Sequence, residues 1–350
     1  SEVPRATIYP KTHYVTPRET VTDCLKLIRE ELKNRIKYLT LVSSIMDNYQ
    51  YETYNLCLNI DNSKSSFSNE FQSSLMALNI VFPEKKIQKE GIEKCFTKLR
   101  GFKYSYKPNI IKKYGRFLKY DLIGAYSCKF KNIFESIINS RGIIFIYSNF
   151  ISGGILPFSL FLEQNGFVKY GHNKEYNNIF DEPRNYISFD GKPKKDFKNK
   201  NDFRQASYIT IIGNENVSIK NDIDKINIVN GENNKYGEEI KVVLASKAGG
   251  EGIDLHRIRE VHILEPWFNL NKIEQAIGRG IRNKSHDDLP LEERNVTVYQ
   301  HIALNPENSE NSQQETTDLK MYRLAEKKQI NIARVEYELK RNAINCFLNK

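Results

Sequence analysis

Short apolar runs alternate with amphipathic stretches in the second half of the chain. Five runs have the length and composition of short buried strands: residues 143–148, 208–212, 241–245, 260–264 and 296–301. Between them, apolar side chains recur at helical spacing in residues 129–138, 156–165 and 273–281. Because strands that alternate with helices are typical of a mostly parallel α/β sheet, the pattern predicts such a domain over residues 121–304.

The beginning of the chain has a different pattern. Thr16, Pro17 and Glu19 form a capping box with proline at the first helical position. A helix running to about Ile45 is predicted by apolar residues three or four positions apart: Leu25, Ile28, Leu32, Ile36 and Leu39. Residues 61–69 are rich in Ser and Asn and interrupt the pattern before short helices follow. Residues 1–120 are therefore predicted to be a mainly helical region.

Three further segments stand out by composition. Residues 171–206 are polar, basic and poor in periodicity, which indicates an insertion or long loop. Residues 305–317 have the composition of a linker. Helical spacing returns in residues 318–350 and predicts a C-terminal helix.

Composition excludes several kinds of protein. The 350 residues are 39% hydrophobic, which is enough for a folded core. The longest apolar run, residues 142–147, is far shorter than the ~20 residues of a membrane helix, so no membrane partner is expected. The five cysteines form no C-x-x-C motif and the six histidines show no ligand spacing, so we expect reduced thiols and no metal site.

The net charge of +10 favours a polyanionic partner. Residues 84–120 hold twelve Lys or Arg against three Glu, with seven aromatic residues among them. This composition predicts nucleic-acid contacts by Lys103, Lys107, Lys112 and Lys113. The alternative is a solvated surface, with rings such as Phe96 and Phe117 in the core. A second basic cluster covers residues 192–204.

The most informative motifs lie between residues 241 and 282. After a predicted strand comes SKAGGEGID (residues 246–254), whose glycines would let the backbone approach a phosphate. Further on comes QAIGRGIR (residues 275–282), where Arg279 and Arg282 would share one helical face with Gln275. Two guanidinium groups suit a transferring phosphoryl group. Each motif also has an ordinary structural explanation when it is considered alone. Residues 246–254 could be a tight turn, and residues 275–282 could be a solvated basic helix.

In this order and spacing, the two motifs resemble motifs V and VI of superfamily 2 helicases and translocases, and residues 141–149 resemble motif IV. The wider pattern resembles helicases of large cytoplasmic DNA viruses, especially mimivirus-like members. These are relatives of the poxvirus early transcription factor small subunit and nucleoside triphosphate phosphohydrolase I. The resemblance covers residues 84–350 and implies an α/β fold: a RecA-like C-terminal helicase lobe.

The resemblance also implies roles for single residues. The γ-phosphate would be faced by Arg282, Arg279 and Gln275, with Arg282 as the arginine finger. The nucleotide would be bound by Gly252, Asp254 and Glu251. The nucleic-acid backbone would lie near Ser148, Asn149, Ser246, Lys247 and Gly250. Trp267 is predicted to pack at the end of a strand rather than to bind.

The motif that binds ATP phosphates is missing from the chain. The single Gly-Lys pair, Gly191-Lys192, has Tyr186 and Pro193 where a P-loop needs Gly and Ser or Thr. Asp181-Glu182 imitates a DE-box, but no P-loop precedes it. We therefore expect the C-terminal half of a two-lobed motor, inactive alone, with ATP and Mg²⁺ bound together with an N-terminal RecA-like lobe of the same protein.

The predicted function is the second motor lobe of a nucleic-acid-dependent NTPase, acting on DNA or RNA in viral transcription or genome processing. The viral transcription machinery is an expected partner, and the viral factory in the cytoplasm or the virion is the expected location. Two alternatives stay open: a non-enzymatic nucleic-acid-binding scaffold, and a Snf2-like double-strand translocase.

Overall fold

The fold is built on a seven-stranded sheet in which all neighbouring strands run parallel. The computed structural model describes residues 41–63, 71–171, 176–213, 222–247, 252–309 and 312–342. The strand order is β1-β9-β8-β4-β7-β6-β5. The strands are β1 (Val42–Ile45), β4 (Ile143–Ser148), β5 (Val168–Lys169), β6 (Ser207–Ile211), β7 (Val242–Ser246), β8 (Ile258–Ile263) and β9 (Thr297–Leu304). A separate antiparallel hairpin pairs β2 (Phe96–Lys98) with β3 (Tyr104–Tyr106).

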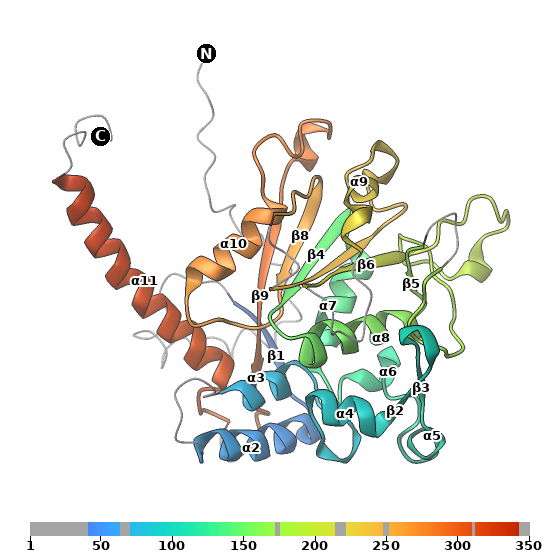
Figure 1. The fold of residues 1–350 in the computed structure, drawn as a ribbon, viewed down its shortest axis with the longest axis horizontal. Helices are drawn as coiled ribbons and strands as arrows, with labels where there is room; N and C mark the ends of the chain where they lie inside the picture. The colour runs from blue at the N-terminus through green and yellow to red at the C-terminus, as the bar shows by residue number, and fades with distance from the viewer. Residues whose placement is uncertain are drawn as a thin grey trace.

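Helices lie on both sides of this sheet (Figure 1). Those before β4 are α2 (Asn48–Asn62), α3 (Gln72–Asn79), α4 (Gln88–Cys95), α5 (Pro108–Tyr114), α6 (Tyr120–Ile123) and α7 (Cys128–Asn139). Those after it are α8 (Leu156–Gln164), α9 (Ile226–Val229), α10 (Leu270–Gly280) and α11 (Thr317–Arg341). A π-helical turn, Ile151–Ile155, leads into α8.

Strand β4 shows how the two layers of helices are held. All six of its residues are buried. Ile144 and Ile146 belong to one core, which includes residues of α7 and α8. Ile143 and Phe145 belong to a second core, which includes residues of α10 and α11. Because successive side chains of a strand point to opposite faces, an uninterrupted apolar run fits a strand covered on both sides.

The predicted fold class is confirmed: the chain is an α/β protein with a parallel sheet and a helix near its C-terminus. The predicted run 143–148 coincides with β4, and the other four predicted strands overlap β6, β7, β8 and β9. The helix predicted to reach Ile45 is wrong at its end, because residues 42–45 form β1. Pairing with β9 along the sheet outweighs the local helical pattern there. The rest of that helix lies outside the described residues.

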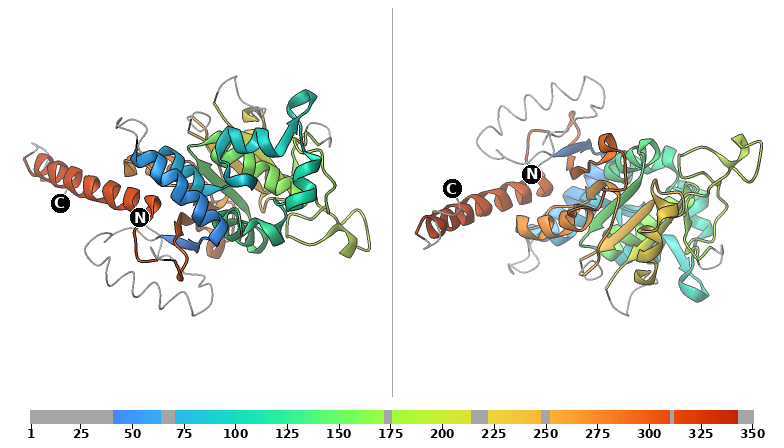
Figure 2. Two further views of the ribbon diagram at one scale, coloured as in Figure 1. Left: turned by 90° about the horizontal axis from the view of Figure 1, so that it is seen from below. Right: turned by 90° about the horizontal axis from the view of Figure 1, so that it is seen from above.

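The segments at the two ends of the described chain are packed together. Helices α2 and α3 lie beside the first turns of α11, and the Thr317 backbone amide donates to Tyr54 Oη at 3.0 Å. From there α11 runs outward, so that its C-terminal half projects from the body (Figures 1 and 2).

The domain boundary at residue 120 stays a prediction, although β1 precedes it and belongs to the same sheet. Across the described ranges, every helix is too short or too polar to cross a bilayer.

Candidate nucleotide and nucleic-acid sites

Four of the predicted nucleic-acid residues lie where β4 and β7 end. The two strands are parallel neighbours, and Ser148 pairs with Ser246 in register. Both serines are buried, and within the described chain Ser246 Oγ has no hydrogen-bond partner. Asn149 is half-buried and Lys247 is exposed. The structure therefore brings Ser148, Asn149, Ser246 and Lys247 to one edge of the sheet.

A buried carboxylate that the sequence did not single out organises this edge. Glu265 follows β8 and has no exposed surface. It accepts hydrogen bonds from Ser148 Oγ at 2.9 Å, from Asn149 Nδ2 at 3.1 Å and from the Asn149 backbone amide. Asn79 Nδ2 also donates to it, at 2.7 Å. Both residues donate to Glu265, but Ser148 is fully buried and Asn149 only half-buried, so Asn149 is the residue of this pair that a ligand can reach.

Burial raises the pKa of the Glu265 carboxyl, and the hydrogen bonds that it accepts act in the opposite direction. Four donors around one carboxylate favour the ionised form, which can only accept. The only signal for this role in the sequence is an acidic residue directly after a predicted strand.

Trp267 lies on the same edge and has two lysines over its ring. Lys247 Nζ is 5.5 Å and Lys272 Nζ is 5.2 Å from the centre of its ring. Burial, and then the neighbouring Lys247, lower the pKa of Lys272. The indole packs against the second core, as the sequence predicted, but it is only partly buried, so part of it is accessible. Two cations over one partly exposed aromatic ring form a surface that a phosphate and a base can both contact.

The predicted nucleotide residues lie further along the chain, beside α10. Arg282 Nε is 3.1 Å from Asp254 Oδ1, and the two side chains are 47% and 60% exposed. The Arg282 guanidinium is also 3.4 Å from the Ile253 carbonyl oxygen. Gly252 has φ +81°, and a Cβ atom there would meet open space. The structure thus brings Gly252, Asp254 and Arg282 together on an accessible surface.

Helix α10 carries the other two predicted catalytic residues. Gln275 is exposed and Arg279 is partly buried. The expectation that Arg279 and Arg282 share one helical face is wrong, because α10 ends at Gly280. A Cβ atom at Gly280 would be 2.8 Å from Val261 Cγ2, so the helix reaches the sheet there and the chain turns away. Of the predicted site residues, Gly250 and Glu251 lie outside the described ranges.

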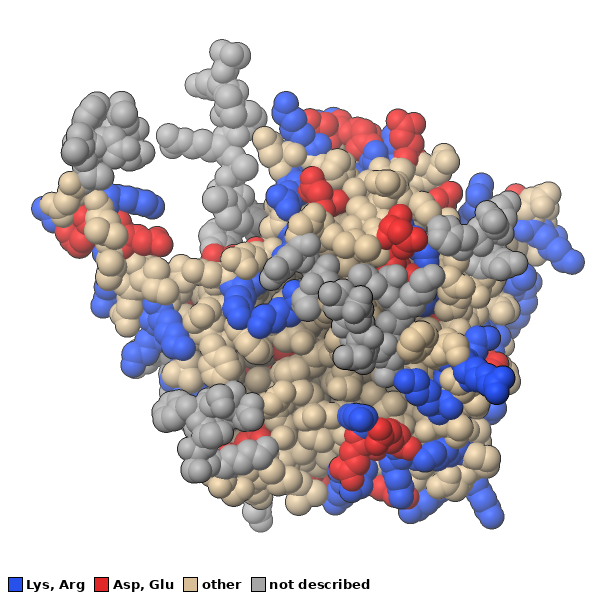
Figure 3. Space-filling view, in the orientation of Figure 1, with Lys and Arg blue, Asp and Glu red and all other residues tan. Residues whose placement is uncertain are grey.

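Within the basic segment, residues 84–120, α5 lies far from α10 (Figures 1 and 2), whereas α4 contacts the π-helical turn Ile151–Ile155 that follows the end of β4. Lys103, Lys112 and Lys113 are exposed, whereas Lys107 Nζ donates to the Glu93 carbonyl at 2.6 Å. Acidic side chains lie among the basic ones on the lower right of the view in Figure 3, over α4 and α5. Five of the twelve cations form ion pairs: Lys85–Glu52, Lys86–Glu90, Lys89–Glu93, Lys94–Glu84 and Arg116–Glu182.

Most of the aromatic rings threaded through this segment are not available for stacking on bases. The core includes Phe96, Tyr104, Tyr106 and Phe117. Phe102 is 48% exposed and has Lys98 Nζ 5.6 Å from its ring centre. The charge of the segment is therefore accessible, but only a minority of its rings are.

The imitation of a DE-box has a structural role. Glu182 accepts hydrogen bonds from Ser105 Oγ, the Tyr106 backbone amide and Arg116 Nε, at 3.1, 2.9 and 3.1 Å. It therefore fastens the β2–β3 hairpin to the segment after β5. In the described part of the chain, His, Cys, Asp and Glu side chains form no group that could hold a metal ion.

Comparison with known proteins shows which class of protein this chain is similar to. Residues 197–284 match the family described as helicase conserved C-terminal domain. The chain is 33% identical over 250 residues to a putative ATP-dependent RNA helicase, L377, of Acanthamoeba polyphaga mimivirus, an alignment covering 67% of this chain and 21% of the relative. The predicted resemblance to the C-terminal half of viral superfamily 2 helicases is thereby confirmed.

The chain is also similar to a second viral protein and to a solved structure. The chain is 33% identical over 241 residues to the termination factor NPH-I homolog of African swine fever virus (isolate Tick/South Africa/Pretoriuskop Pr4/1996), covering 63% of this chain and 32% of the relative. A crystal structure of the C-terminal part of the Fun30 ATPase domain aligns with 83% of this chain and 89% of its own, at 13% identity and TM-score 0.44. The chain spans less than a third of the length of the two viral relatives.

Proposed function

We propose that this chain is the second motor lobe of a nucleic-acid-dependent NTPase, and that the nucleotide binds between it and an N-terminal lobe of the same protein. The exposed Asp254–Arg282 pair beside Gly252 is the observation that carries the proposal. An accessible guanidinium next to an accessible carboxylate can serve a phosphate and a ribose hydroxyl. Mg²⁺ ligands and the P-loop would come from the N-terminal lobe, so this chain alone should not hydrolyse ATP.

The geometry explains how Arg282 can act as an arginine finger. Exposed ion pairs contribute about 0–1 kcal/mol, so exchanging Asp254 for a phosphate oxygen costs little. An arginine that stabilises the transferring phosphoryl group contributes ~10³–10⁵ in rate. Gln275 and Arg279 lie on the helix that precedes Arg282 and would contact the same nucleotide.

The nucleic acid would lie along the edge where β4 and β7 end. Support comes from the half-buried Asn149, the exposed Lys247 and the Trp267 ring with two lysines over it. Ser246, Gly250 and the loop between them would line the same path. The lysines on and beside α5 would form a separate contact, because α5 lies far from α10 (Figure 1). DNA and RNA both fit these features, and the named relatives favour a role in viral transcription.

The proposal is tested in the full-length protein by Arg282→Ala. We expect kcat for ATP to fall by at least about 10³ while nucleotide affinity changes by less than about threefold, because the finger acts mainly in the transition state. Arg294→Ala is the matched control: Arg294 is also exposed and paired with an aspartate, Asp287, at 3.8 Å, and its loss should leave kcat unchanged.

A kcat within about threefold of wild type for Arg282→Ala would show that Arg282 is not the finger. A wild-type protein that binds nucleic acid without hydrolysing ATP would favour the scaffold instead. Movement along a duplex without strand separation would favour the double-strand translocase.

A further inference from the structure

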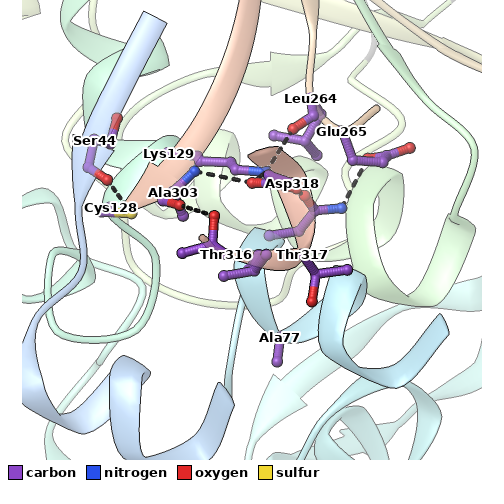
Figure 4. Close-up of polar contacts among 12 residues, drawn as sticks. Ser44, Ala77, Cys128, Lys129, Leu264, Glu265, Ala303, Thr316, Thr317 and Asp318 are labelled. Carbon is purple, nitrogen blue, oxygen red and sulfur yellow. Dashed lines mark hydrogen bonds and ion pairs between the residues drawn. The ribbon is translucent and has the colours of Figure 1, made fainter. Parts of the chain in front are cut away.

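The first turn of α11 is anchored by an ion pair inside the protein. Lys129 Nζ, on α7, is 2.7 Å from Asp318 Oδ2, on α11, and neither side chain has exposed surface. The backbone amide of Ala303, on β9, donates to the same carboxylate oxygen at 2.9 Å. Figure 4 shows Lys129, Asp318 and Ala303 converging. Helix α11 is therefore fixed by a charge that has no access to water.

Lys129 uses its remaining donors on the end of β8 and on α3. It donates to the Leu264 carbonyl at 2.9 Å and to Asn79 Oδ1 at 3.2 Å. An ammonium group has three donors and no acceptor, so these two bonds and Asp318 satisfy it completely. The position of the ammonium thus determines which end of the Asn79 amide faces it.

Asn79 passes this orientation on to Glu265. Since its Oδ1 faces Lys129, its Nδ2 faces Glu265 Oε2, at 2.7 Å, and the Gly153 carbonyl, at 3.2 Å. Without the ammonium, the amide could turn and present an oxygen to the carboxylate, which repels it. Glu265 in turn binds the Ser148 hydroxyl and the backbone amide of Asn149. The series of contacts runs from Asp318 through Lys129, Asn79 and Glu265 to residues 148 and 149.

We propose that Lys129, Asp318 and Asn79 are positioning residues that tie the conformation of the loop at residues 148–150 to the docking of α11. None of the three would touch nucleic acid, since all are buried. Their effect on nucleic-acid binding would pass through Asn149, so this part rests on the proposed function of that loop.

The coupling is tested in the full-length protein with two variants. Asn79→Leu interrupts the series in its middle. Lys129→Met/Asp318→Leu removes both charges of the ion pair together, so that neither Lys129 nor Asp318 is left buried without the other. Glu315→Gln is the control, because Glu315 pairs with Arg323 on α11 at 2.9 Å outside the series.

The direct readout is hydrogen exchange, by mass spectrometry, of a peptide covering residues 147–151. We expect exchange at least tenfold faster than wild type in both test variants and unchanged exchange in the control. Native exchange in Asn79→Leu, or in a folded double variant, would overturn the coupling whatever the binding data show. Unfolding by urea on the same samples establishes that each variant is folded.

The second readout is the affinity for a fluorescent single-stranded oligonucleotide over a salt series. We expect the test variants to bind at least tenfold more weakly with an unchanged log–log salt slope, because no phosphate contact is removed. A reduced slope would mean that lysine contacts were lost and would overturn positioning through Asn149. If Asn149→Ala itself binds normally, the nucleic-acid role of the loop fails, and the exchange data alone decide the coupling.

Discussion

His301 should make the folded chain sensitive to acid. It lies on β9 with 1% of its surface exposed, and His262 Nδ1 on β8 is 2.9 Å from its Nε2. Burial, then the neighbouring His262 and Lys129, hold the pKa of His301 well below its ordinary value of 6.5. The folded protein therefore keeps this imidazole neutral at a pH where the unfolded chain protonates it.

The sign and size of the effect follow from proton linkage. Because the unfolded state binds more protons below pH 6.5, the free energy of unfolding falls as the pH falls, by about 1.4 kcal/mol per pH unit for one group. Because the unfolded histidine protonates around its ordinary pKa, a histidine that stays neutral in the folded state loses up to about 2 kcal/mol of its contribution to stability between pH 7.5 and 5.0. Burial raises the pKa of Glu163, Glu265 and Asp318, which opposes this trend, so the wild-type slope alone does not isolate His301.

The comparison with His301→Gln isolates it. Glutamine can still hydrogen-bond to His262 but does not titrate. The free energy of unfolding of the 350-residue chain is measured in urea at pH 7.5 and at pH 5.0. We expect its fall between the two pH values to be up to about 2 kcal/mol smaller in the variant than in wild type. The two proteins having the same pH dependence within about 0.5 kcal/mol would refute the reasoning.

Two other predictions concern the candidate sites. Gly154→Ala should lower the free energy of unfolding in urea by about 1–3 kcal/mol and weaken nucleic-acid binding. The reason is that the added Cβ would lie 2.1 Å from Ser148 Oγ and displace the hydroxyl from Glu265. A free energy of unfolding equal to that of wild type would contradict this packing. Alanine substitutions throughout the lysine set of the basic segment should reduce the log–log salt slope of binding by up to about one per lost contact, and an unchanged slope and affinity would leave this surface without a role. That set is Lys103, Lys107, Lys112 and Lys113.

The central strands could be predicted from the sequence because burial on both faces leaves an uninterrupted apolar run, as in residues 143–148. β1 could not, because its two central residues are Ser43 and Ser44 and its strand conformation depends on β9, far along the chain. The nucleotide motif could be identified in the sequence by residue type and order. The arrangement of Arg279 and Arg282 could not be predicted, because α10 ends at Gly280, where the helix meets β8.

The charged interior was the hardest part to predict. Lys129 lies in a predicted amphipathic helix and Asp318 near the start of another, where charged residues are ordinarily solvated. Only the folded arrangement of α7, α11 and the sheet places the two side chains against each other. Sequence patterns report which residues are apolar, but they carry no information on which buried charges meet.

The pairing of β1 with β9 also bears on how the chain folds during synthesis. Val42 and His301 are register partners separated by ~260 residues, so at ~5–20 residues per second β1 waits roughly 13–50 s for its neighbour. A strand of four residues with a polar centre is a poor template for association with other chains during that time. A chain shortened past Ile45 would instead leave the eight-residue β9 as the open edge of the sheet, and we expect such a fragment to aggregate as it is made.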